Sequence, residues 1–400
     1  MLKKLHLCLV IGSSYPPYPH GGVGSFAVDL AEGIVKRGHK VTCISYFPTG
    51  GVDSNEPRFE KINGVNIVRI PLPNRRRLPR INAVREKYKL AKLIRTLHQQ
   101  DPFTLIEAED GGGRLALGRL PDIPKIVRLH ATTIYNDYVL HRKPSRLNHL
   151  FEYIWIRRAN FIIAVSDYVG KITLQLTHLQ KKKKYSIIHY AIDTDFYKPM
   201  PEIQGETGLI VFTGVVAPRK GVEELIRAMN IVFSQIPDSK LWIIGDDKYK
   251  VNGEPFSKQI IQSLEAPFKN RVVFLGNKPR EELPSFLQKA EVCCFPSHVE
   301  TFGIGIIEAM AMEKPVIFMR DGPGPEVIED NISGLLCDTW SPEDIAEKIL
   351  FLIRNTEKAR NLGKNGRKRV LDNFEKESWI ERNLDYYQKC LNEFREKRIS

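Results

Sequence analysis

Short apolar runs alternate with longer amphipathic segments along the chain, and this pattern predicts its secondary structure. In the first half, seven apolar runs have the character of buried strands: Leu5–Ile11, Lys40–Tyr46, Val65–Ile70, Leu105–Glu107, Lys125–Leu129, Phe161–Val165 and Tyr185–Ile188. Helices fit between several of them, at Gly24–Arg37, at Ser145–Ala159 and from Ser166 or Asp167 onward. Strands and helices in alternation predict βαβ units and a mostly parallel sheet.

The same alternation restarts near residue 208 and predicts a second domain. We expect strands at Leu209–Thr213, Lys240–Ile244, Val272–Leu275, Val292–Phe295 and Val316–Phe318. We expect helices at Val222–Ser234, Arg280–Lys289, Gly305–Met312 and Pro342–Arg354. The prediction is therefore an α/β protein with two Rossmann-like, doubly wound domains, 1–198 and 208–377, joined by a linker at 199–207. A C-terminal helix over 378–400 is expected to pack back toward the first domain.

The expected binding site follows from this architecture. In open α/β sheets, ligands bind beyond the carboxyl ends of the strands. With two such sheets, the natural place for a ligand is the cleft between the two domains.

Composition narrows the class of protein. Apolar residues make up 42% and charged residues 27% of 400, which is ordinary for a globular chain and excludes a disordered or collagen-like one. None of the six cysteines forms a C-x-x-C pair, so we expect buried thiols in a reducing compartment.

No apolar run approaches the roughly 18–20 residues that span a bilayer. Residues 1–11 resemble a signal peptide only weakly and are interpreted as the first strand. We expect a cytoplasmic protein, or one peripheral to the cytoplasmic membrane face.

The net charge of +13 is distributed unevenly. Residues 1–200 hold 32 Lys and Arg against 16 Asp and Glu, whereas residues 201–400 hold 28 against 31. All of the excess positive charge therefore lies in the first half. Such asymmetry indicates two bodies with different roles, one of which faces a polyanion or an anionic membrane.

Two turns between a strand and a helix have features of phosphate sites. In the first, His-Gly-Gly-Val-Gly at 20–24, the glycines allow backbone N–H groups to approach an anion at a helix N-terminus. It is not G-x-G-x-x-G, so the dinucleotide fingerprint is absent, and a plain tight turn is the alternative. In the second, at 214–221, Arg219 and Lys220 lie at the mouth of a helix, where two cations suit a phosphate. A solvated basic turn is the alternative there.

The strongest motif covers residues 296–311, Pro-Ser-His-Val-Glu-Thr-Phe-Gly-Ile-Gly-Ile-Ile-Glu-Ala-Met-Ala. A buried strand ends in Phe295-Pro296, a glycine-containing turn follows, and an apolar helix comes next. Glu300 lies in the turn and Glu308 lies inside the helix. A carboxylate in such an apolar helix is costly unless it is hydrogen-bonded, and ribose or sugar hydroxyls would serve.

At these motifs the sequence resembles the retaining glycosyltransferases of family 4, which have the GT-B fold. The resemblance covers essentially the whole chain. It includes residues 21–24, the Lys-Arg-Gly-His-Lys-Val-Thr segment at 36–42, His130, Ser166, residues 219–221, the Glu300–Glu308 motif, and residues 324–328 and 334–336.

The resemblance implies a role for each matching residue. His130, Glu300, Lys220 and Arg219 would be the catalytic residues, with the two cations neutralising the departing diphosphate. Glu300 and the backbone of the next residues would hold the transferred sugar, and Glu308 would bind the ribose hydroxyls. The full set expected to bind the donor is Gly21, Gly22, Gly24, Gly214, Thr301, Phe302, Gly303, Ile304, Glu308, Gly245, Asn277 and Lys278.

The sequence departs from the family pattern in three places. Val215 stands where many relatives have Arg, and Ala131 replaces the glycine of the usual His-Gly. Tyr190-Ala191-Ile192-Asp193 replaces the usual Asn-Gly-Val-Asp. Asp193-Thr194-Asp195 has the D-x-D form of a metal motif from another glycosyltransferase fold, but it occupies a structural turn of this family. We therefore expect no metal and no cofactor, because the nucleotide sugar is a substrate.

A basic region of the first domain, Arg75–Arg95, has apolar residues interleaved with its cations. It is typical of an amphipathic segment on anionic lipid, and family relatives with lipid-linked acceptors often dock in this way. A solvated helix face packed on its other side, or part of an anionic acceptor site, remains open. No nucleic-acid-binding module is present, so we expect no nucleic acid as partner.

The sequence therefore predicts a metal-independent retaining hexosyltransferase. It would pass a hexose from a nucleotide sugar, UDP-linked in preference to GDP- or ADP-linked, to a hydroxyl of a lipid-linked or polysaccharide acceptor. Two alternatives remain: another GT-B enzyme such as a nucleotide-sugar 2-epimerase, or a non-catalytic member that binds lipid or protein.

Overall fold

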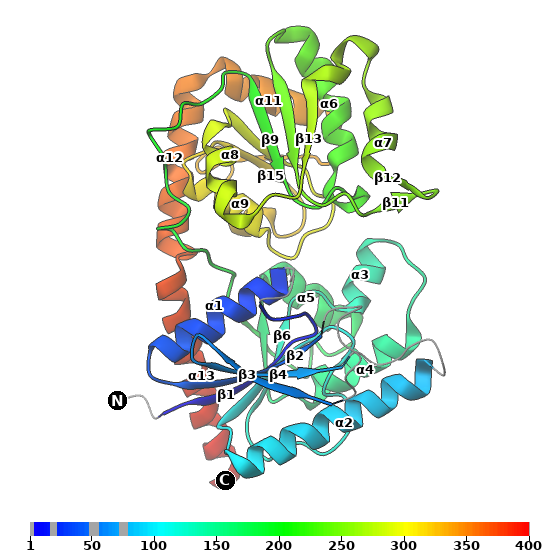
Figure 1. The fold of residues 1–400 in the computed structure, drawn as a ribbon, viewed down its shortest axis with the longest axis vertical. Helices are drawn as coiled ribbons and strands as arrows, with labels where there is room; N and C mark the ends of the chain where they lie inside the picture. The colour runs from blue at the N-terminus through cyan, green and yellow to red at the C-terminus, as the bar shows by residue number, and fades with distance from the viewer. Residues whose placement is uncertain (1–3, 17–21, 48–55, 72–78, 400) are drawn as a thin grey trace. The chain divides into compact units, whose positions relative to one another are not determined.

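The computed structural model describes residues 4–16, 22–47, 56–71 and 79–399. The chain divides into two compact units, each with its own sheet (Figure 1). The first unit comprises Met1–Tyr190 and Glu377–Ser400, and the second comprises Ala191–Lys376. The division lies at 190/191, so residues 199–207, where we expected the linker, belong to the second unit.

The described strands of the first unit form an eight-stranded sheet in the order β3-β4-β2-β1-β5-β6-β7-β8. They are β1 (His6–Val10), β2 (Lys40–Tyr46), β3 (Arg58–Ile62), β4 (Val65–Ile70), β5 (Leu105–Glu109), β6 (Lys125–Leu129), β7 (Phe161–Ala164) and β8 (Ser186–Ile187). All pairings are parallel except that of the edge strand β3 with β4. Every residue of β1 and of β5 is buried, as expected for central strands covered on both faces, and the two glutamates of β5 are buried with them.

The helices of the first unit are α1 (Gly22–Lys36), α2 (Pro79–Gln100), α3 (Thr133–Val139), α4 (Arg146–Arg158), α5 (Asp167–Leu176) and α13 (Lys376–Ile399). Helix α1 buries Phe26, Leu30 and Ile34, and Val35 on the same helix is partly buried. Helix α5 is capped by Ser166, whose hydroxyl accepts a hydrogen bond from the Val169 N–H.

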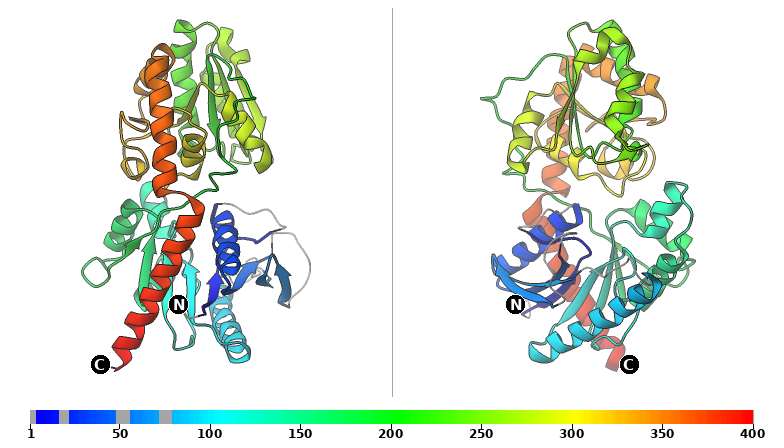
Figure 2. Two further views of the ribbon diagram at one scale, coloured as in Figure 1. Left: turned by 90° about the vertical axis from the view of Figure 1, so that its left-hand side faces the viewer. Right: turned by 45° about the vertical axis from the view of Figure 1, so that its right-hand side comes forward.

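The C-terminal helix α13 packs along the first unit, where Figure 2 shows it in red beside the sheet. Its Asn383 and Tyr387 lie in the core and contact Arg128 of β6. Arg128 is itself paired with Glu107 of β5 through a bond of 2.7 Å, and both side chains are only 1% exposed. Arg37, which follows α1, pairs with Glu377 and Glu381 nearer the surface. A buried ion pair and a polar network therefore hold the last helix in place.

The second unit has a parallel six-stranded sheet in the order β13-β10-β9-β14-β15-β16, together with a small hairpin. The sheet strands are β9 (Leu209–Thr213), β10 (Lys240–Ile244), β13 (Val272–Gly276), β14 (Val292–Phe295), β15 (Val316–Met319) and β16 (Leu335–Cys337), and the hairpin is β11 (Lys250–Val251) with β12 (Glu254–Pro255). The helices are α6 (Val222–Gln235), α7 (Phe256–Ile260), α8 (Leu283–Lys289), α9 (Ile304–Ala311), α10 (Gly324–Val327), α11 (Pro342–Arg354) and α12 (Thr356–Asn373).

Two expectations about chemistry and environment can be compared with the fold. All six cysteines are free and buried, as predicted. Among the described residues, no helix is both long and apolar enough to cross a membrane.

Candidate active site

Lys220 and Glu300 form an ion pair at the carboxyl edge of the second unit's sheet. Lys220 ends a 3₁₀ turn (Pro218–Lys220) that follows β9, and Glu300 lies in the loop after β14. Because β9 and β14 are parallel neighbours, their carboxyl ends lie side by side and the two loops meet. Both side chains are largely buried, and the Ser297 hydroxyl donates a second hydrogen bond of 3.2 Å to Glu300.

The two loops are also locked through their backbones. The N–H groups of His298 and Val299 both donate to the carbonyl of Arg219, at 3.0 and 3.2 Å. Gly221 has a positive φ of 63°, and a Cβ at this position would lie 1.8 Å from the Pro296 carbonyl oxygen. Only glycine fits this close approach, so the residue after Lys220 fixes the distance between the two loops.

Arg219 differs from Lys220 in its surroundings. Its backbone carbonyl accepts the hydrogen bonds from the loop after β14, and its side chain is partly exposed. Among the described residues, its guanidinium makes no side-chain hydrogen bond or ion pair. The structure therefore presents one cation already paired with Glu300 and a second whose donors are available to an anion.

The loop after Glu300 leads directly into helix α9. Gly303 caps the helix with a φ of 106°, and Ile304 is its first residue. The Phe302 side chain is buried and packs edge-to-face on Phe374, with ring centroids 5.3 Å apart. Phe302 can therefore serve a ligand only through its backbone, next to the N–H groups at the positive end of α9. Thr301 precedes it and is partly exposed.

Glu308 lies one turn further along α9 and is partly buried. Burial raises its pKa, and the neighbouring Tyr197 hydroxyl and Arg280 guanidinium partly oppose this. Desolvation, and then the Glu308 carboxylate, raises the pKa of Tyr197 in turn. Glu308 belongs to a sequence motif, whereas Tyr197 and Arg280 lie outside that motif and no spacing connects them to it. The Asp193 of the D-x-D segment pairs with Lys376 and accepts N–H bonds from residues 195 and 196, as a structural turn does.

The remaining donor-binding candidates of the second unit lie at neighbouring strand ends. The Gly214 N–H donates to Ile244, and the Gly245 N–H donates to Gly276. A Cβ on Gly245 would lie 1.8 Å from the Gly214 carbonyl oxygen, so these turns are in direct backbone contact. Asn277 is exposed and Lys278 partly so, directly after β13. Strands β9, β10 and β13 thus bring their terminal turns together.

In the first unit, His130 follows β6 and is only 5% exposed. The Tyr190 hydroxyl hydrogen-bonds its Nδ1, and the two rings are stacked with centroids 5.7 Å apart. The edge of Phe26 from α1 packs on the imidazole at 4.7 Å. Burial, and then the Arg128 charge, lowers the pKa of His130 well below its usual range. The imidazole is therefore neutral near pH 7, and Nε2 is the nitrogen left for a ligand. Tyr190 belongs to the segment that departs from the family pattern.

Two buried carboxyl groups position the loop that follows His130, and sequence reasoning missed both. Glu152 of α4 is fully buried and accepts N–H bonds from Gly112, Thr133 and Ile134, at 2.8, 2.8 and 3.1 Å. Asp110, directly after β5, accepts a long 3.5 Å bond from the Ala131 N–H. Burial, and then the Glu152 and Glu109 charges, raises the pKa of Asp110 well above its usual range. For Asp110, an acid directly after an apolar strand was the available signal, whereas Glu152 lies within α4.

The glycine turn at 20–24 is described only in part. Gly21 lies outside the described residues. Helix α1 begins at Gly22, two residues earlier than predicted, so Gly22 and Gly24 lie in its first turn, exposed and buried respectively.

The basic region Arg75–Arg95 is described from residue 79 onward, as helix α2. Leu90 and Ile94 are in the core, and the Lys87 ammonium lies over the Phe151 ring at 4.4 Å. Four cations on the helix remain exposed: Arg80, Arg85, Lys89 and Lys92. In the described part, one face of helix α2 packs on the first unit and its other face is exposed to solvent.

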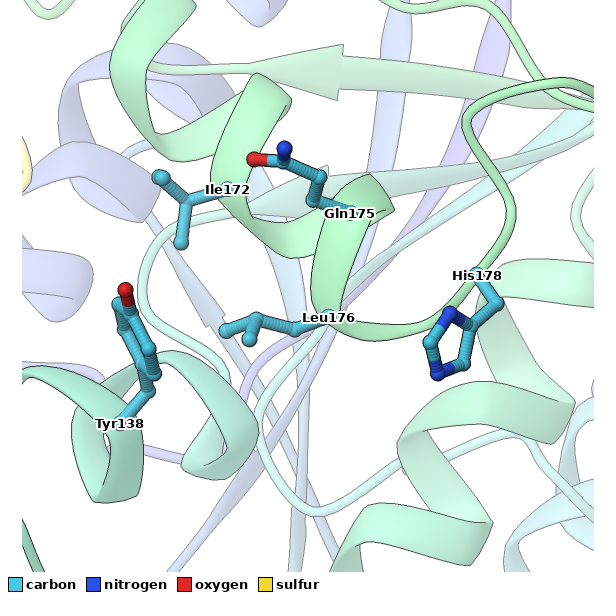
Figure 3. A pocket seen from close by; sticks show the side chains of 5 residues that line it. All are labelled: Tyr138, Ile172, Gln175, Leu176 and His178. Atoms are coloured by element: carbon cyan, nitrogen blue, oxygen red, sulfur yellow. The ribbon is translucent and has the colours of Figure 1, made fainter.

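Two further features carry no assigned chemistry. Among the described residues, no group of three or more His, Cys, Asp or Glu side chains is arranged to hold a metal ion. A pocket of about 280 Å³ in the first unit is lined by Tyr138, Ile172, Gln175, Leu176 and His178 (Figure 3). It contains none of the residues that the motifs single out.

Comparisons with known proteins agree with this geometry. The family model described as Glycosyltransferase Family 4 matches residues 20–196, and that of Glycosyl transferases group 1 matches residues 193–369. An uncharacterized glycosyltransferase of Methanocaldococcus jannaschii is 27% identical over 91% of this chain and 93% of its own length. The N-acetyl-alpha-D-glucosaminyl L-malate synthase of Bacillus anthracis is 25% identical over 96% and 98%.

Solved structures show the same fold. Sucrose-phosphate synthase from Thermosynechococcus elongatus has a TM-score of 0.79 at 21% identity and covers 97% of this chain and 100% of its own. HepE of Anabaena, solved in complex with UDP and glucose, has a TM-score of 0.72 at 20% identity, over 95% and 98%.

Two α/β units, matched across both halves by glycosyltransferase models, define a glycosyltransferase with the GT-B fold. The chain is a glycosyltransferase similar to family 4, since the family 4 model matches its first half and the group 1 model matches its second half. The family and fold predicted from the sequence are thereby confirmed.

Proposed function

We propose that this glycosyltransferase transfers a hexose from a nucleotide sugar to a hydroxyl of a lipid-linked or polysaccharide acceptor, with retention at the anomeric carbon and without a metal ion. The donor is UDP-linked in preference to GDP- or ADP-linked. The observation that carries the proposal is the Lys220–Glu300 pair, set beside the open Arg219 guanidinium and the start of α9. The complexes of HepE with UDP and with UDP-glucose support a UDP-linked donor.

The cations account for departure of the diphosphate. Negative charge grows on the leaving group as the sugar bond breaks, and preorganised donors lower the barrier most where that charge develops. Lys220 and Arg219 supply positive charge, and the first N–H groups of α9 add the positive end of a helix dipole. These groups take the role that a divalent cation fills in other diphosphate enzymes.

Glu300 and Glu308 hold the two ends of the donor. Glu300 is fixed by Lys220 and by the Ser297 hydroxyl, so its carboxylate is oriented to accept hydrogen bonds from sugar hydroxyls. Glu308, facing Tyr197 and Arg280, accepts from the ribose hydroxyls. The backbone of residues 301–303 and the turns at Gly214, Gly245 and Asn277 line the path between them.

His130 contributes from the first unit as a neutral group. Its imidazole is fixed by Tyr190 through Nδ1, which leaves Nε2 for a hydroxyl of the transferred sugar. Asp110 and Glu152 act as positioning residues, because they accept hydrogen bonds from the backbone that follows His130. The exposed cations of α2 support contact with an anionic surface that carries the acceptor.

A thermal-shift screen tests the donor. A ligand that binds only the folded chain stabilises it by about 2.7 kcal/mol at a hundredfold excess over Kd. We expect UDP and UDP-glucose to raise Tm by several degrees, with GDP-mannose and ADP-glucose giving smaller shifts. A shift with NAD and none with any nucleotide sugar would contradict the proposal. A product that is an epimer of the donor sugar, formed without acceptor, would assign the chain to the epimerase class.

A further inference from the structure

We propose that Trp340 forms a saccharide-binding platform on the second unit that binds the acceptor sugar or its chain. This inference rests on the proposed function, since it assigns a subsite to the saccharide acceptor. The side chain of Trp340 is 69% exposed, more than any other large hydrophobic residue in the described part of the chain. It lies in the turn between β16 and α11, three residues after the strand ends.

The indole is held flat against a buried histidine. Its ring is parallel to that of His298, with centroids 3.6 Å apart and an interplanar angle of 8°. The His298 side chain is 5% exposed; its Nδ1 lies 3.1 Å from the Thr339 hydroxyl, and its Nε2 lies 3.0 Å from a Glu224 carboxylate oxygen. One face of the indole is therefore backed by an anchored ring, and the other is open to solvent.

This anchoring fixes the orientation of the platform before any ligand arrives. The backbone N–H of Trp340 also donates a hydrogen bond of 2.9 Å to the Asp338 carboxylate, which fixes the backbone of the turn. A side chain that is already ordered loses little conformational entropy on binding, so more of the contact energy appears as affinity. An exposed tryptophan without a ligand contributes little to folding, whereas one held in this way is suited to recognition.

The platform is continuous with the candidate active site. His298 lies two residues before Glu300 in the same loop, and its N–H donates to the Arg219 carbonyl at 3.0 Å. Glu224 belongs to the first turn of α6, the helix that follows Lys220. A ligand on Trp340 would therefore lie next to the loop that contains His298 and Glu300.

The sheet order separates the platform from the nucleotide side. The turns at Gly214, Gly245 and Asn277 follow β9, β10 and β13, on one side of β14. Trp340 follows β16, two strands away from β14 on the other side. This placement favours a saccharide over the donor base as the ligand.

The chemistry around the ring fits a saccharide. A pyranose presents C–H groups on one face, which pack on an indole, and hydroxyls at its rim, which need polar partners. The Asp338 carboxylate accepts a hydrogen bond from the Trp340 backbone N–H. Arg320, 54% exposed, donates its backbone N–H to the Cys337 carbonyl at the end of β16, and its guanidinium pairs with Asp344. An aromatic face with flanking charged groups provides both kinds of contact.

An NMR experiment on the whole chain tests the platform directly. The chain has four tryptophans, so an indole N–H spectrum gives four signals, and the one lost in Trp340→Phe belongs to Trp340. We expect maltotriose, cellotriose or mannotriose, at tens of millimolar, to shift that signal while the signals of buried Trp155 and Trp379 stay in place. UDP alone should leave it unchanged. A Trp340 signal that moves with UDP and not with any trisaccharide, or with neither, would overturn the proposal.

Kinetics separate this inference from the proposed function. In Trp340→Ala, we expect KM for the acceptor to rise about tenfold, the effect of losing one aromatic anchor. KM for the donor should change less than twofold, and Trp340→Phe should recover part of the loss. Phe351→Ala, a matched control at a 39% exposed aromatic on α11, should leave both unchanged. Transfer that proceeds with an unchanged acceptor KM in Trp340→Ala refutes the platform alone. Absence of any transfer by the native chain refutes the proposed function, and the NMR result then decides the platform.

Discussion

Lys220 is largely buried, pairs with Glu300, and lies at the mouth of α6 next to Arg219. In the proposed reaction it meets both the sugar-binding carboxylate and the leaving diphosphate. Lys220 and Glu300 each lie in a sequence motif. They are 80 positions apart, and they come into contact because β9 and β14 are neighbouring strands.

Replacing Lys220 by alanine tests this role. We expect Lys220→Ala to lose about 2–4 kcal/mol of transition-state stabilisation, the effect of removing one preorganised donor. The corresponding loss in kcat/KM is about 30- to 1,000-fold, measured by steady-state transfer. Lys258→Ala, which breaks an exposed pair with Glu254, is the matched control and should be near native. Near-native turnover by Lys220→Ala would contradict the proposed role of Lys220 in stabilising the leaving diphosphate.

Glu308 gives a prediction with a defined sign in pH. A carboxyl whose pKa is raised in the folded state contributes stability below its unfolded pKa, about 4.3, and loses that contribution as pH rises through the folded pKa. At pH 8 the ionised carboxylate therefore opposes folding. We expect Glu308→Gln to raise Tm at pH 8 and to change it little at pH 4, while weakening donor binding.

Two measurements check this prediction. Tm from differential scanning fluorimetry at both pH values gives the stability term, and titration with UDP gives the affinity. A lower Tm for Glu308→Gln at pH 8, with unchanged UDP affinity, would show that Glu308 is a structural residue with no part in donor binding.

Sequence alone could identify residues of the site that lie in local motifs, but not those that support them. Glu300 and Lys220 occur in turns with recognisable spacing and composition. Tyr190, Asp110, Glu152 and Tyr197 act through tertiary contacts that bring distant segments together. No spacing encodes such contacts. The functional roles of all these residues stay predictions until variants are measured.

Among the elements, the predicted strands of both sheets agree with the structure to within two residues at each end. Strands β2, β4, β6, β9, β10 and β14 have the predicted bounds. Burial on both faces gives a continuous apolar run, which is the clearest strand signal in a sequence.

The missed elements have weaker signals for physical reasons. Strand β3 is an exposed edge strand of mixed polarity, although the Asn63-Gly64 turn that joins it to β4 was an available hairpin signal. Helix α12 packs through small residues, as at Gly363, where a Cβ would lie 2.1 Å from the Glu313 carbonyl oxygen. A helix with small contact residues and many charges has little hydrophobic periodicity. The second unit begins at residue 191, and its first residues form no regular strand that a sequence pattern could mark.

The contacts that hold helix α13 on the first unit can be tested by removing the buried Glu107–Arg128 pair. Glu107→Ala leaves the Arg128 guanidinium buried without its carboxylate, and loss of one partner from a buried pair costs about 3–5 kcal/mol. Arg37→Ala, which removes a more exposed pairing with the same helix, should cost about 1 kcal/mol or less.

Urea denaturation of both variants, with hydrogen exchange of the α13 peptides, gives the comparison. We expect the helix to lose protection in Glu107→Ala and to keep most of it in Arg37→Ala. Equal costs for the two substitutions would mean that the buried network does not hold the helix.

At the scale of the whole molecule, the uneven charge corresponds to the division into two units. The excess of cations lies in residues 1–200, most of which belong to the first unit. Part of this charge is used internally, since Lys87 covers the Phe151 ring and Arg128 is buried. The exposed cations of α2, together with others such as Lys181, Lys182 and Lys184, are available to an anionic acceptor or surface in the proposed function. Most of the residues proposed to bind the donor, including Glu300 and Glu308, lie in the second unit.

The central claim is that the chain transfers a hexose with retention and without a metal ion. The most direct test is the anomeric configuration of the first product, read by proton NMR during transfer from UDP-glucose in the presence of EDTA. The account predicts an α-linked product from the α-linked donor, formed at an undiminished rate. A β-linked first product, or loss of transfer in EDTA that Mg²⁺ restores, would contradict it.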